Sequence, residues 1–98
     1  NASARHWFAA FLASSGRFSE ALNQIERALV LDPLSAGINA EYGVILNLAH
    51  RYNDAIAQLQ RSIDMNPAIG RTHVMLANAY IQTHAFENAL LKPAKLNR

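Results

Sequence analysis

The sequence repeats itself every 34 residues, and this period limits the folds that its 98 residues can adopt. Pro33 and Pro67 stand one period apart, and shifting the sequence by that distance aligns it with itself three times. The aligned sets are Ala9, Gly43 and Ala77; Ala21, Ala55 and Ala89; Phe18, Tyr52 and Phe86; Phe8, Tyr42 and Leu76; Leu12, Leu46 and Tyr80; and Leu22, Ile56 and Leu90. Matching residue types at one fixed spacing indicate repeated structural units.

Each unit contains two stretches in which apolar residues recur with the period of an α-helix. The later stretch runs from Phe18 to Leu29 in the first unit and from Tyr52 to Ile63 in the second, with i, i+3, i+4, i+7 spacing. An earlier stripe begins at Phe8 and recurs one period later. We therefore predict two helices of about 14 residues, some 21 Å long, in each unit. The predicted helices span residues 2–15, 18–31, 36–49, 52–65, 70–83 and 86–97.

The residues between these stretches are typical of helix ends. Gly16 follows the first helix, where a left-handed cap needs a residue without a Cβ. His50 and His84 stand at the same turn of the later units. Pro33 and Pro67 end the second helix of their units, because proline lacks an amide donor and restricts the residue before it. Each unit is therefore predicted to be helix–turn–helix.

Composition agrees with a helical chain and excludes several kinds of site. The sequence has 18 Ala and 12 Leu but only 4 Gly and 3 Pro, which favours helix over a turn-rich β fold. Cysteine is absent, so disulfides, thiolate metal ligands and a catalytic thiol are excluded. The net charge of +2 gives no general reason to expect nucleic acid or an anionic membrane as a partner. No segment has the roughly 18 consecutive apolar residues of a membrane span. A cytoplasmic location is favoured.

Small residues stand where the two helices of a unit are expected to meet. Ala9 and Gly43 belong to first helices, and Ala21 and Ala55 belong to second helices. Small side chains let two helix backbones approach closely, while the aromatic residue that starts each second helix fills the wider gap beside them. An Ala55→Leu substitution is therefore expected to overpack this contact.

Two of the units share a longer motif of apolar, small, aromatic and proline positions. The second unit carries it at Tyr42, Gly43, Leu46, Tyr52, Ala55, Leu59, Ser62 and Pro67. The first unit carries it at Phe8, Ala9, Leu12, Gly16, Phe18, Ala21, Ile25, Ala28 and Pro33. This motif resembles the tetratricopeptide repeat. The resemblance implies an all-α fold, an α-solenoid of three repeats whose six antiparallel helices form a right-handed superhelix. It also implies a single domain over residues 1–98, with repeats at about 2–35, 36–69 and 70–98, the last incomplete.

The sequence departs from that family in two places. The first large apolar position, often tryptophan in the family, holds Arg5, Asn39 and His73. Pro93 falls inside the sixth predicted helix, and since an interior proline costs about 3 kcal/mol we expect a kink or stop near Lys92. The chain is also similar to the repeat tails of bacterial multidomain regulators, which predicts a fragment of a longer protein.

The resemblance implies a concave groove, lined mainly by the first helix of each repeat, that binds a peptide or helix of another protein. The residues expected there avoid both packing stripes, so we expect them to be accessible. Trp7 and Met75 suit a partner's apolar anchors, and Trp7 could alternatively cover the end of the stack. The predicted groove residues are His6, Trp7, Ala10, Glu41, Val44, Asn47, Leu48, Arg71, Val74, Met75, Asn78 and Gln82.

A protein-interaction module is therefore the first functional hypothesis. The alternative is a structural spacer or self-association element that stacks through uncapped end faces into a homo-oligomer. Some members of the family clamp the C-terminal carboxylate of heat-shock chaperones. That clamp is expected to be absent here, because only Arg71 keeps a suitable charge among its five positions and Glu41 would repel a carboxylate.

We do not expect an enzyme, a cofactor, a metal site, or a nucleic-acid or membrane ligand. His6 and Glu41 could meet in the groove as a base and its orienting carboxylate, but no nucleophile, oxyanion loop or glycine-rich phosphate loop accompanies them. His50 and His84 lie one repeat apart without a cluster of carboxylates, which makes a weak metal site. The cationic C-terminus lacks the interleaved aromatic residues of a nucleic-acid platform.

Overall fold

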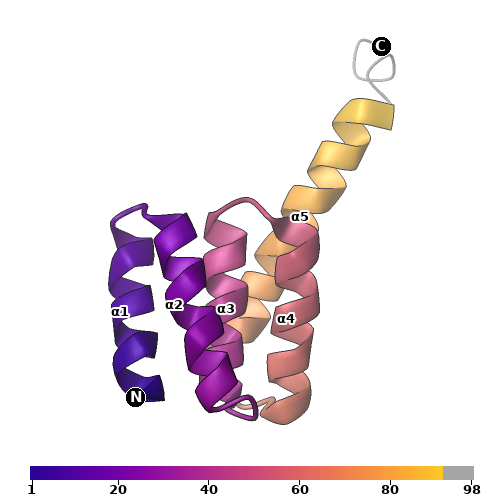
Figure 1. Ribbon diagram of the computed structural model, residues 1–98. Coiled ribbons are helices and arrows are strands. Elements are labelled where there is room, and N and C mark those ends of the chain that lie inside the picture. Colours follow the sequence, from indigo (N-terminus) through magenta and orange to yellow (C-terminus); the bar gives the residue numbers. More distant parts are fainter. Residues whose placement is uncertain (92–98) are drawn as a thin grey trace.

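The computed structural model describes the backbone of residues 1–91 and the side chains of residues 1–84. Within residues 1–91 it contains five α-helices and no strand. The helices are α1 (Ala2–Ser14), α2 (Phe18–Leu31), α3 (Ala36–Leu48), α4 (Tyr52–Met65) and α5 (Gly70–Leu91). Consecutive helices run in opposite directions and stack side by side, and the C-terminal part of α5 extends past the other four helices (Figure 1). The prediction of an all-helical fold is confirmed for these residues.

The turns that join α1 to α2 and α3 to α4 are built alike. Gly16 and His50 adopt left-handed φ angles of 78° and 62°. The amide that follows each of them donates to a carbonyl five residues earlier, at 2.9 and 2.8 Å, which is the hydrogen bonding of a Schellman cap. These caps end α1 and α3. The predicted bounds of the first four helices agree with the structure to within one residue.

The third unit has no such turn. Separate helices were expected over 70–83 and 86–97, whereas α5 continues through His84 to Leu91 as one helix of 22 residues. The expectation of a break between residues 83 and 86 is therefore wrong. The kink expected at Lys92, next to Pro93, lies outside the described residues.

The turn residues of the third unit explain why the helix continues. In the second unit Arg51 precedes α4 and its guanidinium donates to Asp54 at 2.8 Å, and the first unit has an equivalent pair. The third unit holds Ala85 and Asn88 at these positions. Alanine has the highest helix propensity, and it offers no charge to pair across a new first turn. The local sequence therefore favours a continuous helix where the first two units reverse direction.

Small residues bring the helices of the first two units close together, as predicted. Ala9, Ala21 and Ala55 are fully buried. A Cβ built on Gly43 would lie 2.6 Å from the side chain of Leu59, so a larger residue would displace that leucine from the core. The two core clusters lie between α1, α2 and α3 and between α3, α4 and α5.

Candidate partner-binding face

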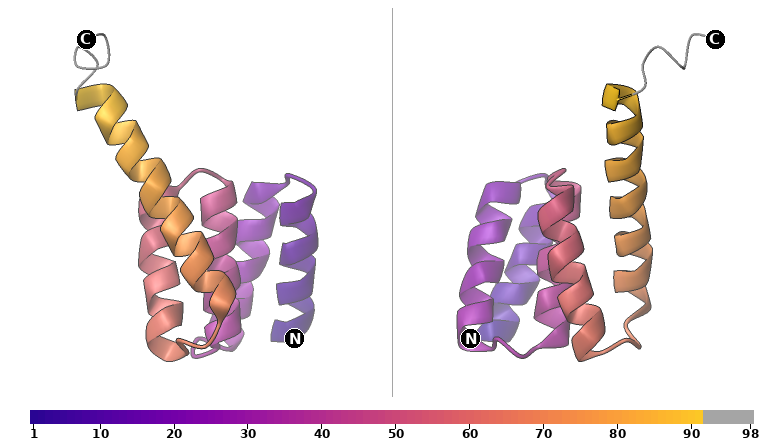
Figure 2. Two further views of the ribbon diagram at one scale, coloured as in Figure 1. Left: turned by 180° about the vertical axis from the view of Figure 1, so that it is seen from behind. Right: turned by 90° about the vertical axis from the view of Figure 1, so that its right-hand side faces the viewer.

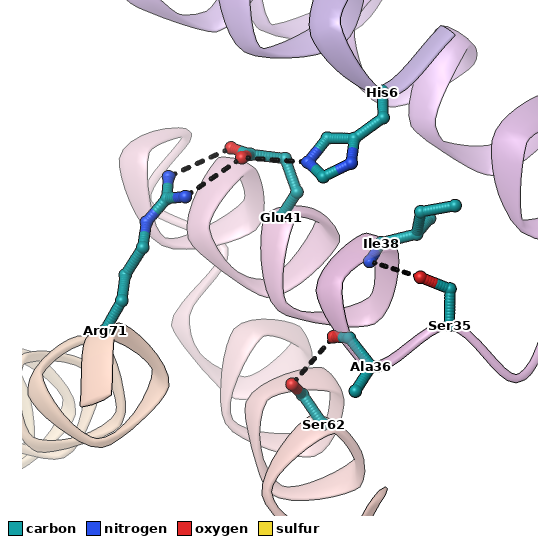
Figure 3. Close-up of polar contacts among 7 residues, drawn as sticks. All are labelled: His6, Ser35, Ala36, Ile38, Glu41, Ser62 and Arg71. Carbon is teal, nitrogen blue, oxygen red and sulfur yellow. Dashed lines mark hydrogen bonds and ion pairs between the residues drawn. The ribbon is translucent and has the colours of Figure 1, made fainter. Parts of the chain in front are cut away.

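The first helices of the three units, α1, α3 and α5, lie side by side with α3 in contact with both neighbours (Figure 2). We call the surface formed by the predicted groove residues on these helices the first-helix face. Local hydrogen bonds fix where α3 begins: the Ser35 hydroxyl accepts from the Ile38 amide at 3.1 Å. The Ser62 hydroxyl of α4 donates to the Ala36 carbonyl at 2.9 Å, which holds this end of α3 against α4 (Figure 3).

A buried carboxylate joins all three helices of this face. Glu41 of α3 accepts two hydrogen bonds from the guanidinium of Arg71 on α5, at 3.1 and 3.2 Å. His6 of α1 places its Nε2 3.4 Å from the same carboxylate (Figure 3). The Glu41 side chain is 4% exposed, so both carboxylate oxygens are used within the protein. A two-point contact between arginine and a carboxylate is strong and directional, and here it ties α5 to α3.

A second polar cluster lies further along the same helices. The Asn47 amide nitrogen of α3 donates to the side-chain oxygen of Asn78 at 3.2 Å and contacts the Met75 sulfur at 3.3 Å. The Asn47 amide oxygen is buried and has no hydrogen-bond partner among the described residues. Sulfur is a weak acceptor, so the Asn47–Asn78 bond is the main polar link between α3 and α5 at this level.

The predicted groove residues divide into a buried floor and an exposed rim. Glu41, Val44 and Asn47 are buried, so the expectation that they are accessible is wrong; α3 packs between α1 and α5, which cover them. His6, Ala10 and Met75 are half-buried. The exposed rim consists of Trp7, Leu48, Arg71, Val74, Asn78 and Gln82.

Trp7 is the largest side chain of the rim. It is 73% exposed, and its ring stacks on that of His6 with the centroids 5.8 Å apart. Trp7 occupies the register position of Glu41 in the first repeat. Because the ring stacks on His6 and is largely exposed, it offers an apolar surface to a partner.

Sequence reasoning missed that the charges of this face pair with one another. The sequence predicts Glu41 and Arg71 as separate groove residues, although both stand on the same side of first helices in adjacent units. Opposite charges at such positions were a signal that they would meet. The sequence allows His6 and Glu41 to meet in the groove, and the structure shows this contact.

The described part of the chain has neither a cluster of metal ligands nor a membrane-spanning helix. Among its side chains there is no group of three or more His, Asp or Glu residues arranged to hold a metal ion. None of its helices combines the length and the apolar character that a membrane crossing needs. The first-helix face presents exposed apolar and amide side chains beside the buried Glu41 carboxylate. That carboxylate already contacts Arg71 and His6.

Antiparallel helix pairs that repeat every 34 residues and stack on one another define an α-helical repeat protein. Residues 10–68, more than half of the sequence, match the tetratricopeptide repeat family. The chain belongs to that family.

Two curated relatives share its sequence pattern. The inactive TPR repeat-containing thioredoxin TTL3 of Arabidopsis thaliana is 30% identical over 74 residues, covering 76% of this chain and 11% of the relative. The Hsp70-Hsp90 organizing protein of Triticum aestivum is 30% identical over 84 residues, covering 79% of this chain and 14% of the relative. The chain thus spans about a seventh or less of the length of these relatives.

Proposed function

We propose that this chain is a protein-interaction module that binds a peptide or helix of a partner protein on its first-helix face. The observation that carries the proposal is the composition of the rim. Trp7, Leu48 and Val74 are exposed apolar side chains from three different helices. Asn78 and Gln82 place exposed amides on α5. Exposed apolar side chains from adjacent helices suit apolar anchors, and amides can bond to a peptide backbone.

The ion pair between Glu41 and Arg71 favours an apolar partner segment over an acidic one. Arg71 is the only lysine or arginine at the five positions of the family's carboxylate clamp, and two of its three guanidinium nitrogens donate to Glu41. A carboxylate arriving at this place would compete with Glu41 for the half-exposed Arg71 guanidinium and would be repelled by the buried Glu41 carboxylate. We therefore propose that the face does not bind the acidic C-terminal tail of a heat-shock chaperone. Micromolar binding of such a tail peptide to the purified chain would contradict this.

Selection from a displayed peptide library, followed by titration of the selected peptides, tests the proposal. Val74→Asp on the rim is expected to weaken binding at least tenfold, because the substitution places a charge beside an apolar anchor. Val30→Asp is the matched control, since Val30 is also an exposed valine, 82% against 65% for Val74, and lies on α2, away from the first-helix face. Equal loss in both variants, or no loss in Val74→Asp, would rule out this face as the binding site.

Self-association through end faces is a second candidate, favoured by one observation on α1. Phe11 is 61% exposed, whereas Ile45, its register equivalent on α3, is fully buried by the preceding unit. A spacer that stacks end to end would cover Phe11 with the last unit of another copy. Sedimentation at several concentrations tests this candidate, because end-to-end stacking gives open-ended oligomers whose size rises with concentration.

We also propose three repeats in one domain, at about residues 2–35, 36–69 and 70–98, within a longer multidomain protein. The register of Phe86, Ala89 and Leu90 with the two earlier units supports the third repeat. The similarity to the repeat tails of bacterial regulators supports the longer parent. The sequence of the full gene tests both points.

A further inference from the structure

The α1–α2 unit exposes a side that is buried in the α3–α4 unit. Ile38 and Ile45 of α3 are buried in the core cluster that the first unit forms. Their register equivalents on α1 are Ala4 and Phe11, and both are exposed, Phe11 by 61%. Phe8 is 48% exposed and lies on the same side of α1, because positions i, i+4 and i+7 share one side of a helix. We give the name N-terminal end face to Ala4, Arg5, Phe8 and Phe11 of α1 with Gln24, Arg27 and Leu31 at the adjoining edge of α2.

Two open hollows lie along this face, where α1 and α2 meet. The larger, of about 440 Å³, is lined by Asn1, Ala4, Arg5, Phe8 and Gln24. The smaller, of about 210 Å³, is lined by Arg5, Arg27, Val30 and Leu31. Arg5 borders both hollows, and its guanidinium donates to the Gln24 side-chain oxygen at 3.1 Å, which holds it between the two helices. The face is therefore indented, so that side chains of a partner can enter it.

The charged side chains that line the two hollows are both arginines. Arg5 is half-buried and Arg27 is exposed. Among the side chains of residues 1–84, neither of them forms an ion pair with a carboxylate. Arg17, on the same helix as Arg27, does pair with Glu20. The N-terminal end face thus combines exposed aromatic side chains with positive charge that the described part of the chain does not neutralise.

We propose that the N-terminal end face docks an acidic amphipathic helix of another protein. The apolar side of that helix lies on Phe8 and Phe11, and aspartate or glutamate side chains at its edge contact Arg5 and Arg27. Exposed aromatic side chains suit the apolar anchors of a helix, and an arginine binds a carboxylate through strong, charge-assisted hydrogen bonds. This site is separate from the first-helix face, and the inference does not depend on the function proposed for that face.

Charge favours an acidic partner over a second copy of this chain. Another N-terminal end face would bring two more arginines and no carboxylate from its hollows, so like charges would approach each other. The helix α5 lies at the other end of the row formed by α1, α3 and α5 (Figure 2). Residues 70–84 of α5 contain no aspartate or glutamate. A copy stacked through this part of α5 would therefore cover Phe11 but would leave Arg5 and Arg27 without a carboxylate from that helix.

Two stapled helical peptides of equal length test the proposal. Both carry leucine at i, i+3, i+4 and i+7, and they differ only at the edges of this leucine stripe, where one has glutamate and the other has lysine. Fluorescence polarisation measures their binding to the full chain. We expect the glutamate peptide to bind at least about tenfold more tightly than the lysine peptide, with an affinity that falls as salt is added. Equal affinities, or no binding of the glutamate peptide, would overturn the proposal.

Charge reversal at α2 tests whether the arginines bind the acidic edge. Arg27→Glu is expected to lower the affinity for the glutamate peptide at least about tenfold and to raise the affinity for the lysine peptide. Arg61→Glu is the matched control, because Arg61 is the exposed register equivalent on α4 and its reversal changes the net charge by the same amount. Equal losses in both variants would mean that only the net charge attracts the peptide, which would contradict a site at the N-terminal end face.

A pair of apolar substitutions separates this site from the first-helix face. Phe11→Asp is expected to abolish binding of the glutamate peptide, because the substitution places an acid where the peptide's apolar side should lie. Val74→Asp, on the first-helix face, should leave that binding unchanged. Loss in Val74→Asp without loss in Phe11→Asp would place the peptide on the first-helix face and overturn the proposal. Circular dichroism of each variant shows whether the helices are retained.

Sedimentation of the chain without peptide tests the other possible occupant. We expect no association that Phe11→Asp abolishes. Self-association that is lost in Phe11→Asp, together with a glutamate peptide that does not compete with it, would mean that a second copy covers this face and would overturn the proposal.

Discussion

The α3–α4 unit and α5 share the apolar pattern of one repeat, although few of their residues are identical, and they end in different structures. In the second unit His50 turns left-handed, Arg51 pairs with Asp54, and α4 folds back over α3. In the third unit Ala85 replaces the arginine and the helix runs on. The apolar pattern is present in both, so that pattern alone does not make the chain reverse. The turn residues decide whether the apolar stripe is covered by the next helix or left exposed.

The largest expected difference between the two units lies in their core positions. Leu46 is 1% exposed, and Leu46→Ala should lower the free energy of unfolding by about 2–5 kcal/mol through the loss of buried surface and the cavity left behind. Tyr80→Ala removes the register-equivalent residue of α5, which is half exposed. It should cost less than half as much in urea unfolding at a concentration where the chain is monomeric. Similar losses in both variants would show that Tyr80 is as buried in the folded chain as Leu46.

Overpacking should again distinguish buried from exposed positions. Ala55→Leu places a large side chain between α3 and α4 and is expected to cost about 1–3 kcal/mol. Ala57→Leu, two residues further on the same helix, changes an exposed position and should be nearly neutral. Thermal melts of both variants measure the difference. An Ala55→Leu variant as stable as the wild type would contradict the close approach of these two helices.

The attachment of α5 to α3 should depend on the buried carboxylate. Arg71→Ala leaves Glu41 with His6 as its remaining partner and is expected to cost about 1–2 kcal/mol, discounted because the arginine itself is half exposed. Glu41→Gln in the same background removes the unpaired charge and should recover part of the loss. Hydrogen exchange of α5 amides measures the effect. If protection of α5 stays unchanged in Arg71→Ala, the ion pair does not hold that helix.

The smallest effect should come from restoring the missing turn. Ala85→Arg with Asn88→Asp installs the pair found in the second unit, which contributes a few tenths of a kcal/mol. We expect the carbon chemical shifts of residues 84–86 to move away from helical values. The single substitution Asn88→Asp is the control, because it adds the acid without its partner. Helical shifts in the double variant would mean that the ion pair has no part in the turn.

Most of the fold could be predicted because the information for it is local. The 34-residue period, Gly16 and the two prolines determine where the first four helices begin and end. The helix break predicted between residues 83 and 86 was wrong. His84 matches His50, but the residue after it is alanine where the second unit has Arg51. For the candidate site, the helices and their residues were predicted, but burial was not. The sequence predicts an accessible Glu41, whereas α1 and α5 pack on either side of it and bury its carboxylate.

The sequence alone determined the helical repeat, its period and the family, because residue types at fixed spacing specify helices and their ends. The tertiary structure decided which of those residues meet. It placed His6, Glu41 and Arg71 in one buried network, since three helices far apart in sequence converge there. It also left Tyr80 and Ile81 without cover, because the reversal of a chain depends on a small balance between helix propensity and turn contacts. Residue spacing determines where the helices begin and end, and the packing of the helices determines which side chains are exposed.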